Sequence, residues 1–153
     1  MRILMTLLVL VGLVTAGQAQ LVLNEEDGLY YTQEGELYTG TYVEYFTSGN
    51  KRIEMAVVDG KKQGVSTYYF DNKLKQEIRS FDNNKMDGVW ETWNEKGVKI
   101  GVASYKKGIK HGVWKIYDEK GTLRYDMVYV DGKKSGVWKI YNEEGTLTAT
   151  KEY

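Results

Sequence analysis

The chain has 153 residues, with 21 basic and 21 acidic side chains, a single histidine, and neither cysteine nor proline. This balance of charge argues against nucleic acid as a partner, and against an anionic membrane, because both attract a basic surface. Without cysteine there is no disulfide framework, so packing alone must stabilise the fold, and 13 tyrosines and four tryptophans supply much of the material for it.

The first 19 residues are predicted to be a secretory signal peptide. Arg2 gives a positive start, residues 3–14 are almost continuously apolar, and Gly17 and Ala19 place small residues before the expected cut. The apolar run is too short for a spanning helix, and the alternative is an apolar anchor that stays uncleaved. We expect cleavage after Ala19, one domain over residues 20–153 with no membrane span, and a secreted or periplasmic protein.

The rest of the chain repeats with a period of 24 residues. A glycine marks each unit, at Gly40, Gly64, Gly88, Gly112 and Gly136. An aromatic residue follows each glycine by five positions, as Tyr45, Tyr69, Trp93, Tyr117 and Tyr141. Self-similarity of this kind is typical of a repeat array, in which each unit is one supersecondary element packed on its neighbours.

Each unit is predicted to be two antiparallel strands. In the clearest unit, residues 113–117 are β-branched and aromatic, and residues 122–130 alternate with a period of two, with Leu123, Tyr125, Met127 and Tyr129 on one side. A loop ending in Gly121 joins these strands, and Asp131-Gly132 forms the tight turn to the next unit.

The same turns recur in the other units. Asp59-Gly60 and Lys107-Gly108 match Asp131-Gly132, and Asn83-Asn84 occupies the corresponding place, because asparagine tolerates positive φ. Gly49, Gly97 and Gly145 match Gly121, whereas Lys73 stands at that position in the second unit. We expect Asn72 to supply that turn instead.

An all-β fold follows, since no segment shows an apolar stripe at helical spacing. About four and a half units predict nine or ten strands, with residues 29–32 as an atypical first strand, in an extended, twisted, single-layer meander sheet. Trp114 and Ile116 are expected to point to one face and Val113 and Tyr117 to the other, so aromatic residues line both faces. Equivalent aromatic residues of neighbouring hairpins are expected to stack as ladders.

Residues 132–145, with the sequence GKKSGVWKIYNEEG, resemble the YwqK-type antitoxin repeat, a relative of the MORN (membrane occupation and recognition nexus) repeat. Residues 108–121 fit the same pattern with Ile109 in place of lysine, and residues 84–97 fit it with Asn84 for the first glycine and Trp93 for tyrosine. The resemblance covers about residues 36–153. It implies an array of β-hairpins that is used for contacts with other proteins.

The sequence contains no recognisable catalytic constellation. The only histidine, His111, lies in a turn and varies among the units, so we expect it to be solvated, and no cluster of metal ligands can form from it without cysteine or a second histidine. We therefore expect no enzyme activity, no cofactor and no metal site.

The aromatic rows are the candidate partner-binding residues. Trp90, Trp114 and Trp138 are expected on one face, and Tyr69, Trp93, Tyr117 and Tyr141 on the other. The lysine-rich turns at residues 61–62, 106–107 and 133–134 are expected along one edge, either solvated or facing an acidic partner. We predict an exported, non-enzymatic scaffold that binds another protein. The alternatives are a cell-envelope glycan-binding module that uses exposed aromatic ladders and a purely structural accessory subunit.

Overall fold

The computed structural model describes residues 8–9 and 21–153, and these form strands joined by turns. The larger sheet consists of β4 (Gly40–Tyr45), β5 (Lys51–Val58), β6 (Lys61–Tyr69), β7 (Lys75–Asp82), β8 (Lys85–Met86), β9 (Gly88–Trp93), β10 (Lys99–Lys106), β11 (Ile109–Lys110), β12 (Gly112–Tyr117), β13 (Leu123–Val130), β14 (Lys133–Tyr141) and β15 (Leu147–Glu152). The predicted signal peptide lies outside the described residues, apart from β1 (Leu8–Val9).

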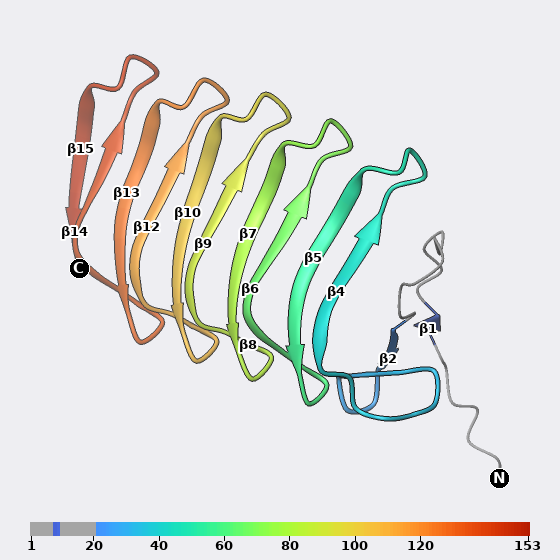
Figure 1. The fold of residues 1–153 in the computed structure, drawn as a ribbon. Coiled ribbons are helices and arrows are strands. Elements are labelled where there is room, and N and C mark those ends of the chain that lie inside the picture. The colour runs from blue at the N-terminus through green and yellow to red at the C-terminus, as the bar shows by residue number, and fades with distance from the viewer. Residues whose placement is uncertain (1–7, 10–20) are drawn as a thin grey trace, which may run out of the picture.

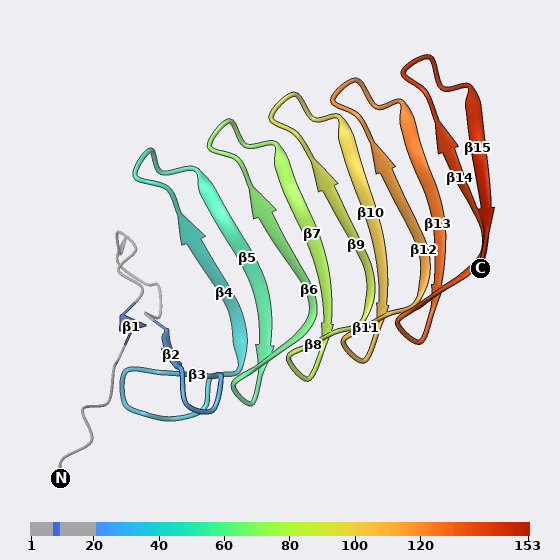
Figure 2. The ribbon, with the colours of Figure 1, turned by 180° about the vertical axis from the view of Figure 1, so that it is seen from behind.

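The larger sheet is an antiparallel meander in chain order, from β4 at one end to β15 at the other. Ten strands form its main path, while the short β8 and β11 pair with β7 and β10. Figures 1 and 2 show the hairpins side by side in a single curved layer. The predicted all-β, single-layer meander of 24-residue hairpins is therefore confirmed.

The first predicted strand belongs elsewhere. β3 (Leu29–Tyr31) forms at the expected place, but it pairs with β2 (Val22–Asn24) in a separate three-stranded sheet with β1, and not with β4. A bridge between Tyr31 and Leu37 folds the chain back on itself here. The Tyr30 N–H then donates to the Gly60 carbonyl over 2.8 Å, so the segment is bonded to a turn of the larger sheet and does not extend its edge.

The turns at the lower end of the sheet in Figure 1 have the predicted geometry. In all four, the first central residue has φ between 47° and 51° and the second between 65° and 86°: Asp59-Gly60, Asn83-Asn84, Lys107-Gly108 and Asp131-Gly132. Two positive φ angles are characteristic of the type I′ turn, whose twist matches that of the flanking strands.

The loops at the upper end differ from expectation in one unit. Gly49, Gly97, Gly121 and Gly145 have φ between 77° and 88°, as expected of glycine, but Lys73 itself adopts φ of 70°. The prediction that Asn72 takes this conformation is wrong. The Asn72 side chain instead accepts a hydrogen bond from the Leu74 N–H over 3.0 Å and so supports the loop.

A register shift occurs at the upper end of each of the five hairpins. In the fourth hairpin it falls between Ile116 and Tyr117, so Ile116 pairs with Tyr125 while Tyr117 pairs with Leu123. Because directly opposite residues point to the same face, Leu123 shares a face with Tyr117 and not with Tyr125. The strict alternation predicted for residues 123–129 therefore fails at its first member.

Candidate functional site

The register defines two faces of the larger sheet. Trp90 lies opposite Ala103 and Trp114 opposite Met127, and Trp138 occupies the same position in the last hairpin. We call the face that carries these tryptophans the Trp face. The opposite face carries Val65, Val89, Val113 and Val137, all of them exposed, and is called the valine face. As predicted, Ile116 lies on the first face and Tyr117 on the second, because both belong to β12 with Trp114.

A continuous row of aromatic rings crosses the Trp face. Seven rings take part, with neighbouring centroids 4.8–5.5 Å apart and planes tilted by 52–65°: Phe81, Trp90, Tyr105, Trp114, Tyr129, Trp138 and Tyr153. The prediction that equivalent residues stack on each other is wrong. Equivalent positions lie two strands apart, roughly 9.6 Å, and a ring from the intervening strand fills that space.

The intervening rings were missing from the predicted site. Phe81, Tyr105, Tyr129 and Tyr153 also recur every 24 residues, so the signal for them was present in the sequence. What the period does not reveal is which strand places its ring beside which, because that depends on the register of each hairpin.

The indoles are fixed by hydrogen bonds to the sheet itself. The Nε1–H of Trp90 donates to the Ser80 carbonyl over 3.0 Å, and that of Trp114 donates to the Ser104 carbonyl over 2.9 Å. Trp138 makes the same contact with the Val128 carbonyl over 3.0 Å. The polar atom of each indole is thus satisfied internally, and the carbon surface of the ring remains for packing.

Lysines lie over the rings of this row, on the side nearer the lower turns of the sheet. Lys110 Nζ is 4.3 Å from the Trp114 centroid and 4.9 Å from that of Tyr129. Lys134 Nζ is 4.7 Å from both the Trp138 and the Tyr153 centroids. Such placement of an ammonium group over aromatic rings is an attractive cation–π arrangement.

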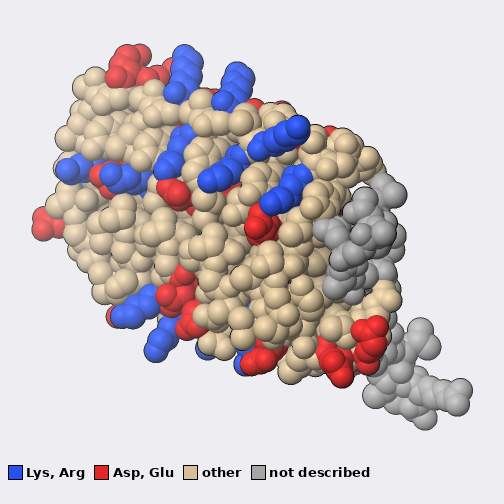
Figure 3. Space-filling view, viewed as in Figure 1, with Lys and Arg blue, Asp and Glu red and all other residues tan. Residues whose placement is uncertain are grey.

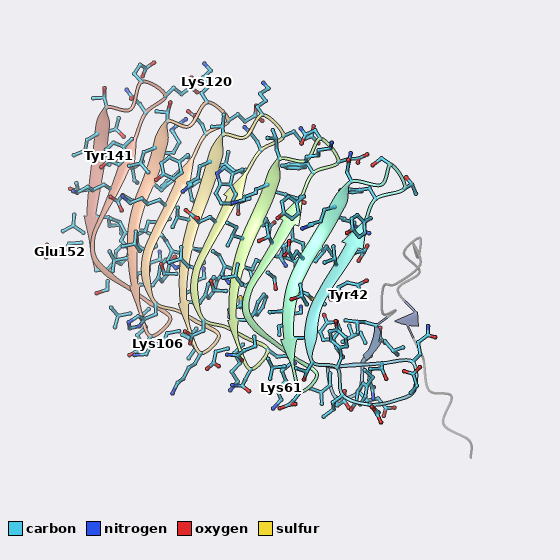
Figure 4. The ribbon with its side chains drawn as sticks, viewed as in Figure 1. Tyr42, Lys61, Lys106, Lys120, Tyr141 and Glu152 are labelled. Atoms are coloured by element: carbon cyan, nitrogen blue, oxygen red, sulfur yellow. The ribbon has the colours of Figure 1, made fainter. Side chains whose placement is uncertain are left out.

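The lysine-rich turns do lie along one edge, since Lys61 and Lys106 are both at the lower end of the sheet, whereas Lys120 is at the upper end (Figure 4). They are not simply solvated. Lys134, from one of these turns, lies over the ring row, and Lys62 Nζ, from another, is 5.1 Å from the Phe81 centroid.

At one end of the array the Trp face is covered by the chain itself. Leu21 and Tyr30 form a buried cluster there with Tyr42, Met55 and Val57. The last three are equivalent by the repeat to Trp114, Met127 and Tyr129. The N-terminal segment, residues 21–38, therefore occupies on the first hairpin the kind of surface that the later hairpins leave open.

Burial has a measurable effect on this cluster. Tyr30 is only 6% exposed, and its burial, together with the neighbouring Tyr68 and Tyr42, raises its pKa to about 12. Further along the same face, Ile116 is 45% and Tyr125 41% exposed, and they lie directly opposite each other. The uncovered part of the Trp face thus presents an apolar surface to solvent.

The second predicted row lies on the valine face, close to the upper loops. Among the described residues, Tyr69, Trp93, Tyr117 and Tyr141 make no ring-to-ring contact with one another, in contrast to the row on the Trp face. Lys51 Nζ lies 5.8 Å from the Tyr69 centroid and Lys99 Nζ 5.4 Å from that of Trp93. The structure therefore separates these four rings, which we had expected to form a ladder.

Ion pairs cross the valine face. Lys51 pairs with Glu54 over 2.5 Å, Lys115 with Asp126 over 3.7 Å, and Lys99 with Glu91. Figure 3 shows how basic and acidic side chains gather together in a band across the strands on the side that it presents. Paired charges of this kind on an exposed sheet favour solvation over tight partner binding, because the partner would have to desolvate them.

A cavity of about 500 Å³ lies at the upper loops of the first hairpins, with Phe46, Tyr68 and Phe70 among its walls. Arg52, which also lines it, donates to Glu44 over 2.6 Å, so its charge is already paired. Phe46 and Phe70 stand where later units have an asparagine or aspartate that supports the loop. The cavity is therefore a local departure from the repeat.

His111 takes part in a recurring contact between units. In four units, the side chain at the position of His111 accepts a hydrogen bond from a backbone N–H of the next lower turn. The donor is the first central residue of that turn, and the distances are 2.8–3.4 Å. The acceptor–donor pairs are Thr39–Asp59, Gln63–Asn83, Asp87–Lys107 and His111–Asp131. The expectation of a simply solvated side chain is wrong. Variation at this position hid a shared role, because four different side chains supply an acceptor.

No group of three or more His, Cys, Asp or Glu side chains within residues 8–9 and 21–153 is placed to hold a metal ion. The same residues contain no helix whose length and apolar character would suffice to cross a bilayer.

Comparison with known proteins supports the repeat assignment. A family model described as a MORN repeat variant matches residues 110–131, which run from β11 to the turn after β13 and include Trp114. A search of curated proteins finds no significant match to the chain. The chain thus contains a MORN-related repeat in its fourth hairpin.

Proposed function

We propose that this chain is an exported, non-enzymatic repeat protein that binds another protein through the uncovered Trp face of β9 to β14. The observation that carries the proposal is the N-terminal segment. It places Leu21 and Tyr30 against Tyr42, Met55 and Val57, so the molecule itself provides an example of a chain segment packed on this face. The equivalent surface further along is uncovered.

The composition of the surface supports a protein as the partner. Tryptophan and tyrosine are enriched among residues that dominate binding energy, since they bury a large rigid area. Burying apolar surface contributes roughly 25 cal/mol per Å², and Ile116 and Tyr125 are exposed large apolar residues at the centre of this region. The MORN-related match at residues 110–131 and the YwqK-type resemblance of the other units favour the same role.

A glycan is the alternative, because aromatic rings also pack against sugar rings. The lysines favour a protein, however. Lys110 and Lys134 lie beside the rings without a carboxylate partner among the described residues, so they can pair with acidic side chains of a protein, which a neutral sugar does not offer.

Two matched substitutions test the proposal. Ile116 and Val113 lie on the same strand, on opposite faces, and are 45% and 44% exposed. Envelope and secreted fractions are passed over immobilised wild-type protein, Ile116→Glu and Val113→Glu. We expect one protein to be retained by wild type and by Val113→Glu but lost with Ile116→Glu. Retention that is insensitive to Ile116→Glu, or retention of peptidoglycan or polysaccharide alone, would contradict the proposal.

Export is tested separately. N-terminal sequencing of the protein recovered outside the cytoplasm should begin at Gln20, because the small residues Gly17 and Ala19 precede that position. Recovery of a membrane-embedded product that still begins at Met1 would overturn the proposed localisation.

A further inference from the structure

Three lysines beside the ring row of the Trp face lack carboxylate partners, whereas Arg79, which lies over the Trp90 ring, is paired with Glu77. Lys110, Lys134 and Lys151 face aromatic rings, and within the described chain none of them lies within 4.0 Å of an acidic oxygen. On the valine face, lysines 51, 99 and 115 are each paired with a carboxylate. An acidic partner therefore suits the part of the Trp face that carries Lys110 and Lys134.

The spacing of these lysines restricts the shape of the partner. Lys110 and Lys134 are equivalent residues of neighbouring hairpins, and such residues lie two strands apart, roughly 9.6 Å. Met86 occupies the same position one hairpin earlier. A segment that crosses the hairpins along the ring row must therefore present a like side chain every 9–10 Å or so.

Of the regular backbone conformations, polyproline II matches this interval best. It has three residues per turn and a rise of about 3.1 Å, so every third side chain points the same way after roughly 9.3 Å. A β-strand repeats each face after roughly 6.7 Å, and two turns of α-helix span about 10.8 Å. The strand repeat is out of step within one hairpin, and the helical repeat exceeds the hairpin spacing by about 1 Å at each hairpin.

The hydrogen-bonding groups of the row fit the same conformation. A polyproline II segment makes no internal hydrogen bonds and leaves its carbonyls available. The indole N–H groups are used within the sheet, but the hydroxyls of Tyr105 and Tyr129 make no side-chain hydrogen bond to another described residue. Aromatic-lined surfaces with such donors are a known way to bind polyproline II segments.

We propose that the segment bound by the Trp face is an acidic polyproline II segment with a carboxylate at every third residue, crossing the hairpins along the ring row. Its carboxylates pair with Lys110 and Lys134, and its apolar residues pack on the rings between them. The inference rests on the proposed function, since it specifies the partner of the same face.

Synthetic peptides provide the test. The probe is blocked (Glu-Pro-Pro)₄, and binding is measured by calorimetry and by tryptophan fluorescence on the purified protein. Blocked (Gln-Pro-Pro)₄ removes the charge, and blocked (Glu-Gly-Ser)₄ keeps the charge spacing but loses the stiffness. We expect (Glu-Pro-Pro)₄ to bind and each control peptide to bind about tenfold more weakly, because one loses charge-assisted contacts and the other pays the entropy of ordering.

Two variants that the repeat itself suggests locate the site. Lys110→Met with Lys134→Met copies Met86 at equivalent positions, and Lys133→Ile copies Ile109 at the adjacent one. The double variant should weaken binding of (Glu-Pro-Pro)₄ by about tenfold or more, while Lys133→Ile should change it little. Circular dichroism and thermal melting verify that both variants keep the fold.

Three results would overturn the inference: no binding of (Glu-Pro-Pro)₄, equal binding of (Gln-Pro-Pro)₄ or (Glu-Gly-Ser)₄, or an equal loss with Lys133→Ile. None of these results would decide the proposed function, because the capture experiment with Ile116→Glu and Val113→Glu uses natural partners and no peptide. If the capture experiment retained no protein through Ile116 while (Glu-Pro-Pro)₄ still bound, the proposed protein-binding function would be wrong. The peptide-binding site would remain, without a natural protein partner.

Discussion

At the scale of single residues, the repeated glycines are required for two distinct structural reasons. Gly112 has φ of 95°, and a Cβ there would lie 3.2 Å from Ser104 Cβ, so both the backbone and the space restrict it. Gly136 has φ of 65°, but a Cβ there would have open space around it. Positive φ is therefore shared by both glycines, while close approach of another residue restricts Gly112 only, because it depends on the neighbouring strand.

Gly136→Val should therefore destabilise the protein by roughly 1–3 kcal/mol, because a β-branched residue is strained at positive φ. Gly112→Ala should cost more than Gly136→Ala, since only at Gly112 does the added Cβ meet another side chain. Denaturant unfolding of the three variants measures this. An unchanged midpoint for Gly136→Val would show that the glycine is merely tolerated.

Tyr30 gives the N-terminal segment a pH dependence. Its pKa is raised from 10.0 to about 12 by burial, so the folded state holds the phenol proton more tightly than the unfolded state does. The contribution of Tyr30 to stability is complete below pH 10 and declines as the pH rises towards 12. Between pH 9 and 11.5, wild type should lose about 2 kcal/mol more than Tyr30→Phe.

This difference is read from unfolding free energies of the two proteins at both pH values. Tyr30→Phe keeps the ring in the cluster and removes only the ionisable group, so it separates the titration of Tyr30 from that of the lysines and other tyrosines. Parallel pH curves for the two proteins would mean that Tyr30 is not buried on the sheet.

At the scale of elements, local chemistry made the hairpins predictable and long-range packing did not. Val113 to Tyr117 and the turn at Asp131-Gly132 were predicted from propensity and turn residues, and both form. The register shift beside Tyr117 was not predicted. It comes from an extra residue in β13, and the alternation of residues along β12 does not reveal that extra residue. The covering of Tyr42 by Tyr30 was also missed, since residues 21–38 lie outside the repeat.

The last hairpin should behave as a separable element. β15 pairs with β14 alone in the described sheet, and all its residues are exposed. Deleting residues 146–153 should remove hydrogen-exchange protection from the end of β14 that faced β15 and leave β9 protected, because β9 lies between β7 and β10. Loss of protection throughout β9 would reveal one indivisible cooperative unit.

At the scale of the whole molecule, neighbouring hairpins are joined at both ends of the sheet. At the lower turns, side chains such as Asp87 accept from the next unit, here from the Lys107 N–H over 2.9 Å. At the upper loops, the Asn72 and Asn94 amides donate to carbonyls of the next loop over 2.9 and 3.0 Å. Contacts that join only neighbours give a nearly one-dimensional array, which holds the aromatic row in register along its length.

The central claim is that this row and the apolar residues beside it bind a protein. The most direct measurement is photo-crosslinking in the native organism, with benzoylphenylalanine placed at position 116 on the Trp face or at position 113 on the valine face. These two positions are on one strand and almost equally exposed. We expect a discrete crosslinked protein from position 116 and none from position 113. Crosslinks from position 113 alone, or the same products from both positions, would contradict the central claim.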